Sequence, residues 1–364
     1  MSEEKTIEKR LEELRHEIDD LDKQILSCLK RRFEIVREVG ELKRKLGRTI
    51  LDLGRERLLL ERILKENKGA FPEESLKAIY LEIINTCRQA QEYQKVAYLG
   101  PEATFSHMAA IKFFGHAADF VPLESVLDVF EEVESGRVHF GVVPVENSIE
   151  GTVSTTLDAF SDYKLHICGE IYVPITHELL NQTGRREDIK KVLSHPHALA
   201  QCRRWLRKNL PSVAVEEVSS TAFAARWAAV DPSVAAIASP LAARTYHLQV
   251  VAAHIEDFRG NVTRFWIIGK INPEPTGKDK TSLFFSVPDR PGALFEVLSC
   301  FAQRGINLSK IESRPAKSEP WRYLFFLDCE GHATDPIVKE CLEELQKICV
   351  HLEWLGSYPA GEAP

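Results

Sequence analysis

The N-terminal segment carries apolar side chains at the spacing of one long amphipathic helix. From Thr6 to about Leu46 the apolar positions recur in steps of four and three, which is the heptad seam of a helix that packs against another helix. They are Ile7, Leu11, Leu14, Ile18, Leu21, Ile25, Cys28, Ile35, Val39, Leu42 and Leu46. Arg32 occupies a seam position where an apolar residue is expected. A buried guanidinium is costly without an anionic partner, so Arg32 is a candidate anion ligand.

Two more cations flank this seam. Arg15 follows one seam leucine and Lys43 follows another, and either one alone is typical of a solvated helix face. Arg15 and Arg32 lie about 25 Å apart along an α-helix, so one small ligand cannot contact both within a single chain. If both bind one anion, the helix must pair with a copy of itself in antiparallel orientation, which brings Arg15 of one subunit to Arg32 and Lys43 of the other.

Two shorter helical patterns follow, from Asp52 to Lys65 and from Pro72 to Gln94. The i, i+3, i+4 rule places polar residues together on one face of each predicted helix. These residues are Asp52, Arg55 and Glu56 on the first helix, and Cys87 and Gln91 on the second. Asp52 is equally consistent with a helix N-cap.

The next 175 or so residues alternate between strand and helix patterns, which is typical of an α/β domain with a parallel or mixed sheet. Strands are predicted at Lys95–Leu99, Phe140–Val145, Lys191–Ser194, Ala214–Val218 and Val234–Ala238. Helices are predicted at Ser106–Phe114, Val153–Phe160, Pro196–Leu210 and Thr221–Val230.

The turns after these strands are unusually polar and small. They contain Thr104, Phe105 and Ser106, then Glu146, Asn147 and Ser148, then Ser194 and His195, and finally Ser219, Ser220 and Thr221. Ligands of open α/β sheets bind at the carboxyl ends of strands, where turns and helix N-termini supply donors. Any one of these turns is more often an ordinary N-cap. Together they predict a ligand cleft.

At Asn261–Ile268 a short polar segment is followed directly by an apolar run that is typical of a strand. Its hydroxyl and guanidinium, on Thr263 and Arg264, face either solvent or a cleft if the segment is a buried strand. In a regular strand Thr263 and Phe265 point one way and Arg264 the other. The triplet therefore lies at the mouth of the strand, or Arg264 has a structural role.

The C-terminal part of the chain predicts a separate small unit. Residues 272–280 are polar and rich in proline, which is typical of a linker. Beyond it the strand and helix patterns follow the order βαββαβ, which predicts a ferredoxin-like fold. The strands are Ser282–Val287, Leu308–Ser313, Tyr323–Cys329 and Leu352–Leu355, and the helices are Ala293–Arg304 and Pro336–Val350.

Composition narrows the function classes. Hydrophobic residues make up 44% and charged residues 28%, and the net charge of -7 argues against nucleic-acid binding as the main role. No apolar stretch of membrane length and no leader are found, which predicts a cytoplasmic chain without a membrane partner. The eight cysteines form no CxxC pair and are expected to be reduced. His195, His197 and Cys202 lack a second pair of ligands, so no metal or cofactor is predicted.

The helical segment resembles the all-helical class of chorismate mutases, which are intertwined dimers with composite sites. The resemblance rests on Arg15, Arg32, Lys43, Asp52, Arg55, Glu56 and Gln91. It implies Arg15 and Arg32 on the two carboxylates of chorismate, Lys43 and Gln91 on the ether oxygen, and Glu56 with Asp52 near the ring hydroxyl. Cys87 stands where many members carry serine. A pericyclic rearrangement needs a clamp and electrostatic help at the breaking bond, which fits these residues.

The α/β segment is similar to the prephenate dehydratase catalytic domain. The similarity rests on Tyr98–Ser106, Val143–Ser148, Ser194–Pro196 and Asn261–Phe265, with Ala103 in place of the usual glycine. It implies a two-lobed fold like that of periplasmic binding proteins, with a crossing near Val173–Thr176 and a return near Val250. The implied site residues are Thr104, Ser106, Glu146, Asn147, Ser148, Thr263, Arg264 and Phe265.

This second resemblance also implies the chemistry of the site. Prephenate loses CO₂ and its ring hydroxyl as the ring becomes aromatic, so the enzyme must hydrogen-bond or protonate the departing hydroxyl. Thr263 is the candidate donor. Arg264 is expected to meet the pyruvyl carboxylate, because gripping the carboxylate that is lost would stabilise the ground state.

The C-terminal unit closely resembles the ACT regulatory domain of phenylalanine-sensing dehydratases. The resemblance rests on Asp289–Leu294 and Ile306–Pro315. It implies a phenylalanine site formed by Gly292, Ala293, Leu294, Asn307, Leu308, Glu312, Ser313 and Arg314. A glycine at a helix entry lets backbone N–H groups approach a carboxylate, although Gly292 could equally do no more than start the helix.

The three resemblances predict a multidomain enzyme of the bifunctional chorismate mutase/prephenate dehydratase family. The expected domains are an all-α mutase domain at 1–94, an α/β two-lobed dehydratase domain at 95–271, and an α+β ferredoxin-like ACT domain at 281–358. Such an enzyme takes chorismate through prephenate to phenylpyruvate, is inhibited by phenylalanine, and forms a homodimer or a larger homo-oligomer. The alternative is a cytosolic sensor that binds small molecules without turnover, although a sensor has no reason to carry the mutase residues.

Overall fold

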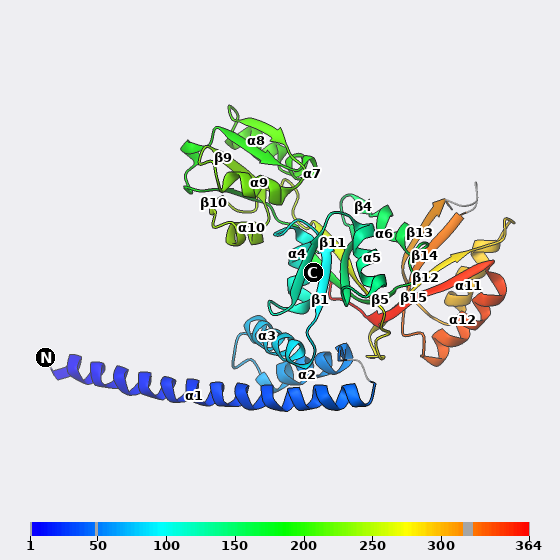
Figure 1. Ribbon diagram of the computed structural model, residues 1–364, viewed down its shortest axis with the longest axis horizontal. Coiled ribbons are helices and arrows are strands. Elements are labelled where there is room, and N and C mark those ends of the chain that lie inside the picture. The colour runs from blue at the N-terminus through cyan, green and yellow to red at the C-terminus, as the bar shows by residue number, and fades with distance from the viewer. Residues whose placement is uncertain (1, 48–49, 316–322, 364) are drawn as a thin grey trace.

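The computed structural model describes residues 2–47, 50–315 and 323–363. Figure 1 shows a helical unit, two lobes that each contain a sheet, and a C-terminal sheet covered by helices. The chain runs through these parts in order, except that one late strand returns to the first lobe. The predicted combination of all-α, two-lobed α/β and α+β parts is therefore present.

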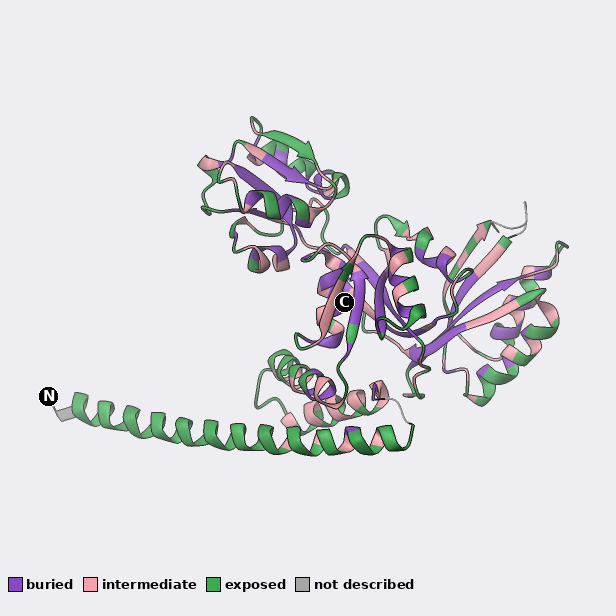
Figure 2. Cartoon of the chain, in the orientation of Figure 1, coloured by how far each residue is buried: buried purple, intermediate pink, exposed green. Residues whose placement is uncertain are grey.

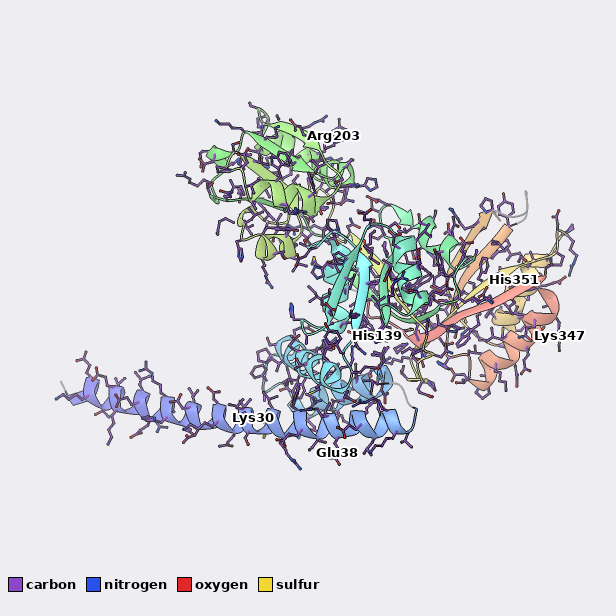
Figure 3. All side chains as sticks on the ribbon, in the orientation of Figure 1. Lys30, Glu38, His139, Arg203, Lys347 and His351 are labelled. Carbon is purple, nitrogen blue, oxygen red and sulfur yellow. The ribbon has the colours of Figure 1, made fainter. Side chains whose placement is uncertain are left out.

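The helical unit consists of α1 (Ser2–Lys45), α2 (Leu53–Asn67) and α3 (Glu73–Gln91). The predicted long N-terminal helix is confirmed. The other two helices lie against the C-terminal half of α1, and its N-terminal half extends away from the rest of the chain (Figure 1). The apolar seam along this extension is exposed, with Ile7 and Ile25 each 58% accessible (Figure 2). Figure 3 shows that the side chains of α1 between its N-terminal end and Lys30 project into open space.

The first lobe contains a mixed sheet with strand order β2-β1-β3-β11-β5, and β4 pairs with β3. Helix α4 covers one face, and α5 and α6 cover the other. The elements are β1 (Lys95–Leu99), α4 (Phe105–Phe114), β2 (Asp119–Leu123), α5 (Val126–Ser135), β3 (Phe140–Asn147), β4 (Gly151–Thr152), α6 (Ser154–Ala159), β5 (His166–Pro174) and β11 (Val262–Gly269).

The second lobe contains a sheet of order β10-β6-β9-β7-β8. Its elements are β6 (Glu178–Asn181), η1 (Arg186–Asp188), β7 (Lys191–Ser194), α7 (Pro196–Gln201), α8 (Arg203–Asn209), β8 (Ala214–Glu217), α9 (Thr221–Ala228), β9 (Val234–Ala238), α10 (Pro240–Thr245) and β10 (Gln249–Ala252). The helix predicted at 196–210 is two helices, because Cys202 leaves the helical conformation at φ -110° and ψ 10°.

The two lobes are joined by two crossings of the chain. The first lies between β5 and β6, where the sequence predicted it. The return predicted near Val250 was placed too early, because β10 still pairs with β6 and the chain leaves the second lobe only after Ala252. Strands β2, β5, β6 and β10 were not among the predicted elements.

The C-terminal unit has the predicted βαββαβ order. Its elements are β12 (Asp279–Ser286), α11 (Ala293–Gln303), β13 (Leu308–Pro315), β14 (Tyr323–Glu330), α12 (Pro336–Ile348) and β15 (His351–Pro359). The antiparallel sheet has the order β13-β14-β12-β15. Helices α11 and α12 cover one face with Leu283, Phe285 and Leu327. The opposite face lies against the first lobe.

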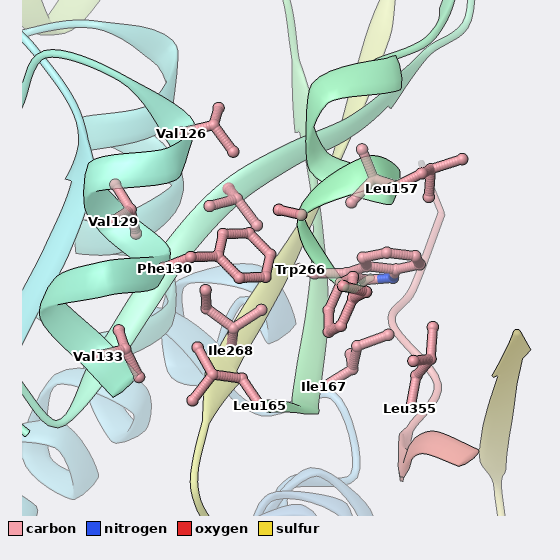
Figure 4. Packing of buried hydrophobic residues seen from close by; sticks show 14 of the residues in the cluster. Val126, Val129, Phe130, Val133, Leu157, Leu165, Ile167, Trp266, Ile268 and Leu355 are labelled. Carbon is pink, nitrogen blue, oxygen red and sulfur yellow. The ribbon is translucent and has the colours of Figure 1, made fainter. Parts of the chain in front are cut away.

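The first lobe and the C-terminal unit share one hydrophobic core. Trp266 and Ile268 of β11 pack with Phe130 of α5 and Leu157 of α6, and Leu355 of β15 closes the cluster (Figure 4). Each large side chain buried in this way contributes roughly 1.5–3 kcal/mol. The C-terminal sheet is therefore fixed against the face of β11 that carries Trp266, opposite the face that α4 covers.

Candidate functional site

The helical unit forms an open cavity of about 970 Å³ between α2, α3 and the C-terminal half of α1. Six of the seven residues predicted for the helical site line it. They are Arg32, Lys43, Asp52, Arg55, Glu56 and Gln91. Cys87, which shares a helix face with Gln91, also lines the cavity and accepts a hydrogen bond from Nη1 of Arg32. The six residues come from three separate segments, and the packing of the three helices brings them together as the resemblance implied.

The cavity is strongly basic. Among the described residues that line it, six are cationic and two are acidic. The cations are Arg31, Arg32, Lys43, Arg55, Arg62 and Arg88, and the acids are Asp52 and Glu56. Such an excess of positive charge in a recess attracts and orients a small ligand with two negative charges.

Two ion pairs shape the wall of this cavity. Nε of Arg88 donates to Oε1 of Glu56 over 3.1 Å, and Nη2 of Arg88 donates to Oε2 of Glu56 over 2.5 Å. Nζ of Lys43 lies 3.7 Å from Oδ2 of Asp52 and donates to the backbone oxygen of Ile50 over 3.2 Å. Asp52 is also the N-cap of α2, as the alternative interpretation held, and it accepts from the backbone N–H of Arg55.

Arg88 is a residue that sequence reasoning missed. Its side chain is buried, and its Nη1 has no hydrogen-bond partner in the described part of the chain. Helical spacing could have identified Arg88 as a site residue, because it precedes Gln91 by three positions and therefore lies on the same helix face.

Arg15 lies outside the cavity. It is on the exposed extension of α1, about 25 Å along the helix from Arg32, as the helical rise requires. Within one chain the predicted set is therefore incomplete at this one position.

In the first lobe, Thr263 and Asn147 meet across the β3–β11 pair. Nδ2 of Asn147 donates to Oγ1 of Thr263 over 2.8 Å and to Oδ1 of Asn261 over 2.7 Å. Oδ1 of Asn147 accepts from the backbone N–H groups of Ile149 and Glu150, which fixes the orientation of the amide. Because Asn147 donates to it, the Thr263 hydroxyl is left to donate its own proton.

Arg264 points to the other side of the sheet. Its Nε donates to Glu170 over 2.6 Å and its Nη1 to Asp328 over 2.6 Å, and the residue is only 5% exposed. The expectation that Arg264 meets a substrate carboxylate beside Thr263 is therefore corrected. The stated alternative, a structural role, fits these contacts, because regular alternation along β11 separates the two side chains.

Glu146 also faces away from Thr263, for a different reason. The β3–β11 register shifts between Arg264 and Phe265, so that β3 has a bulge at Val145. Val145 lies in the core shared with the C-terminal sheet, and Glu146 on the same side pairs with Lys310 of β13 at 2.9 Å. Its expected place in the cleft is corrected accordingly, because a bulge interrupts the alternation that the sequence pattern assumes.

The remaining predicted residues of this lobe serve local structure. Phe265 is buried in the core beneath α4, so its expected contact with the substrate is corrected. Thr104 is the N-cap of α4 and Ser106 is buried in its first turn, while Ser148 accepts from the backbone N–H of Val262 over 3.0 Å. The N-cap alternative thus describes Thr104.

Three comparisons with known proteins bear on these sites. Family models described as type II chorismate mutase, prephenate dehydratase and ACT domain match residues 14–92, 96–273 and 281–346. A bifunctional chorismate mutase/prephenate dehydratase of Aquifex aeolicus is 50% identical over 353 residues, which cover 96% of this chain and 98% of that relative. The chain belongs to the bifunctional chorismate mutase/prephenate dehydratase family.

Two further matches cover the dehydratase and ACT parts. A prephenate dehydratase of Bacillus subtilis is 37% identical over 279 residues, which cover 72% of this chain and 98% of that relative. The solved structure of a prephenate dehydratase from Arthrobacter aurescens in complex with L-Phe has a TM-score of 0.67 at 41% identity, covering 73% of this chain and 90% of that chain. The predicted family and fold class are therefore confirmed.

A hydrogen-bond network links the two lobes of the dehydratase domain. Gln201 of α7 accepts from Asn261 over 3.2 Å and donates to Glu150 over 3.0 Å. Nδ1 of His197 lies 2.8 Å from the same carboxylate, beside an interlobe cavity of about 340 Å³. Sequence reasoning noted His197 but missed Gln201 and Glu150, because nothing local indicates that α7 meets the β3–β4 turn.

The predicted effector residues of the ACT domain divide between two surroundings. Gly292 starts α11 with a φ of 83°, a left-handed conformation that suits glycine. Glu312 accepts from the Thr152 hydroxyl over 3.0 Å, and Arg314 lies 3.7 Å from Asp158, so both contact the dehydratase domain. Asn307 donates to Glu330. The others are Ala293, which is buried, Leu294 and Leu308, which are half-buried, and Ser313, which is exposed.

Two absences hold for the part of the chain that the structure describes. No group of three or more histidine, cysteine, aspartate or glutamate side chains is placed to hold a metal ion. No helix among residues 2–47, 50–315 and 323–363 is both long and apolar enough to cross a membrane.

All eight cysteines are free. Burial raises the pKa of the Cys168 thiol to about 12, which keeps this side chain protonated.

Proposed function

We propose that this chain converts chorismate to prephenate in its mutase domain and prephenate to phenylpyruvate in its dehydratase domain, and that phenylalanine acts on it through the ACT domain. The observation that carries the proposal is the basic mutase cavity, which gathers Arg32, Lys43 and Gln91 from two helices. A sensor without turnover has no need of this set. We further propose a reducing, cytoplasmic setting, which suits eight free cysteines.

In the mutase cavity the residues act by positioning and charge. Arg32 would hold one carboxylate of chorismate, and Lys43 with Gln91 would stabilise the negative charge that develops on the ether oxygen as its bond breaks. Glu56 would approach the ring hydroxyl, held in place by its two hydrogen bonds from Arg88. No nucleophile is required, and none of these groups changes its covalent state.

The second carboxylate requires a partner subunit. The exposed apolar seam of α1 supports an antiparallel pairing with a second copy, since contiguous apolar stripes of this length mark protein interfaces. Such a pairing would bring Arg15 of one subunit into the cavity of the other. We therefore propose a dimer with two composite mutase sites.

In the dehydratase domain Thr263 is the proposed donor to the departing hydroxyl. Asn147 donates to Oγ1 of Thr263 and thereby directs its proton outward, toward a bound substrate. The network through Asn261, Gln201 and Glu150 connects this pair to the second lobe, which supports a site that forms between the lobes. The hydroxyl leaves as water with the donated proton, and the electron pair of the broken C–CO₂ bond completes the aromatic ring as CO₂ departs.

The proposal is tested by adding chorismate to the purified protein and following prephenate and phenylpyruvate by chromatography. Wild-type protein should produce phenylpyruvate, and phenylalanine should slow its appearance. Thr263→Ala protein should accumulate prephenate, because its mutase domain is unchanged. Binding of chorismate without any turnover would establish the sensor alternative and refute the proposal.

A further inference from the structure

Two neighbouring strands of the dehydratase sheet carry adjacent residues that face opposite sides. On β11, Thr263 faces Asn147, whereas Arg264 faces the ACT domain. On β3, Asn147 faces Thr263, whereas Glu146 faces the ACT domain because of the bulge at Val145. The proposed proton donor and its orienting amide are therefore each bonded, through a single peptide unit, to a charged residue that contacts the ACT domain.

Arg264 is held by two carboxylates and one hydroxyl, which come from three strands. Its guanidinium contacts Glu170 of β5 and Asp328 of β14, each at 2.6 Å, and it donates to the hydroxyl of Tyr358 on β15 over 3.1 Å. Lys280 of β12 pairs with the other oxygen of Glu170 at 2.8 Å. Three of these partners belong to the ACT domain. The cluster is almost wholly buried, so little solvent screens its charges.

A second contact joins the predicted effector segment to β3. Lys310 of β13 pairs with Glu146 at 2.9 Å and also donates to the Thr152 hydroxyl over 3.3 Å. That hydroxyl donates to Glu312, one of the predicted effector residues. Strand β4, which carries Thr152, pairs with β3 at Glu146 and Asn147. The effector segment is therefore connected through Thr152 of β4 to the part of β3 that carries Asn147, the residue that orients Thr263.

We propose that Arg264 and Glu146 are positioning residues that set the geometry of the Thr263–Asn147 pair according to the position of the ACT sheet. The inference rests on the proposed function and names the contacts through which phenylalanine acts. When the ACT sheet moves relative to the dehydratase sheet, the ion pairs of Glu146 and Arg264 draw the ends of β3 and β11 with it. A hydrogen bond between Asn147 and Thr263 weakens steeply with such changes of distance and angle.

This role differs from that of an interface which only holds two domains together. A structural interface would change stability and leave the response to phenylalanine intact. A positioning interface would change kcat of the dehydratase and the extent of inhibition together, and would leave phenylalanine binding and the mutase unchanged. An effector shifts activity only through its different affinity for two states, so cutting the connection removes inhibition without removing binding.

The first test replaces Lys310, whose partner Glu146 is partly exposed and so tolerates its loss. The full chain is made as wild type, Lys310→Met and Lys310→Arg. Dehydratase kcat and KM are measured with prephenate across a phenylalanine titration, and phenylalanine binding is measured by calorimetry. The matched control is Arg304→Met, which breaks the Arg304–Glu344 pair between α11 and α12, on the ACT face away from the dehydratase domain.

Typical couplings predict roughly 5- to 150-fold inhibition of the wild-type protein. Lys310→Met should bind phenylalanine with little change but be inhibited less than about twofold, with an altered kcat. Lys310→Arg should restore inhibition, and Arg304→Met should behave as wild type. Full inhibition of Lys310→Met with wild-type kcat would overturn the role of Glu146.

A second variant tests the buried cluster itself. Asp328→Asn removes one charge that faces Arg264 and keeps the shape and the hydrogen bond to Ser282. It should weaken inhibition at least as much as Lys310→Met, with mutase activity as the measure of folding. Inhibition equal to that of wild type in both variants would refute the proposal. A wild-type protein with no dehydratase activity would instead refute the proposed function, because that measurement involves no altered contact.

Discussion

The mutase cavity and the β11 site show how differently a helix and a strand convert sequence into a site. In the helical unit, six of the seven residues implied by the mutase resemblance line one cavity, and Arg15 is the exception within the chain. On β3 and β11 the predicted residues separate, and Arg264 and Glu146 face the ACT domain instead of the cleft.

The difference has a physical cause. In a helix the direction of each side chain follows from hydrogen bonds within the same segment, so spacing alone determines which residues share a face. In a sheet the direction depends also on the register with the neighbouring strand, and one bulge reverses it. Val145 supplies such a bulge directly after Pro144, and proline within a central strand is itself a signal of a bulge.

The largest expected effect separates the proposed proton donor from a core residue on the same face of β11. Thr263→Ala should lower dehydratase kcat by about 10²- to 10³-fold and leave mutase turnover intact, because it removes one positioned donor. Phe265→Leu, on the same face but in the core, should cost less than about 1.5 kcal/mol of stability and little activity. The two activities are measured in one preparation. Equal losses of dehydratase activity in both variants would erase the distinction between donor and core residue.

The composite mutase site gives the next largest effect. Arg15→Ala and Arg32→Ala should each lose about 10²-fold or more in mutase kcat/KM, because each leaves one substrate carboxylate unpaired. Mixing the two variants with subunit exchange should restore about a quarter of the wild-type sites, since half of the dimers are mixed and each mixed dimer has one intact site. Exchange is verified by native mass spectrometry. No recovery after proven exchange would count against a shared site.

A substitution at Arg88, which sequence reasoning missed, tests whether this residue shapes the helical site. Arg88→Met should lower mutase kcat/KM by about tenfold, because Glu56 loses two charge-assisted hydrogen bonds. Arg62→Met is the matched control, since it removes an equal charge from the same cavity wall. A similar loss in both variants would attribute the effect to net charge and not to the position of Glu56.

The smallest expected effect concerns Ala103, which has a φ of 66° in the turn before α4. Ala103→Gly keeps the left-handed conformation and removes its cost to an L-residue, about 1–2 kcal/mol, against about 0.5–1 kcal/mol of added chain entropy. The buried Ala103 methyl group is lost as well, which costs about 0.8 kcal/mol. The free energy of unfolding, measured by urea titration, should therefore change by less than about 1 kcal/mol. The control Ala109→Gly loses an equally buried methyl group within α4 and relieves no left-handed residue, so its free energy of unfolding should fall by about 2 kcal/mol. An equal fall in both variants would show that the turn carries no strain.

The sequence by itself determined the long helix α1, the βαββαβ order of the ACT domain, and which polar residues share a face within each short helix of the mutase domain. These features depend on hydrogen bonding within a segment and on apolar periodicity, and both are written locally in the chain. The break at Cys202 and the strands β5 and β10 were missed because their patterns become clear only when their neighbours are known.

Only the tertiary structure decided what Arg264 and Glu146 contact. Their partners Asp328 and Lys310 lie 64 and more than 160 positions away in the chain, and no local pattern indicates that those strands meet. Docking the ACT sheet on one face of β11 converted two expected substrate contacts into ion pairs between domains, a buried one at Arg264 and a partly exposed one at Glu146. Side-chain identity is local information, but the direction of a strand residue is set by the strand and the domain packed beside it.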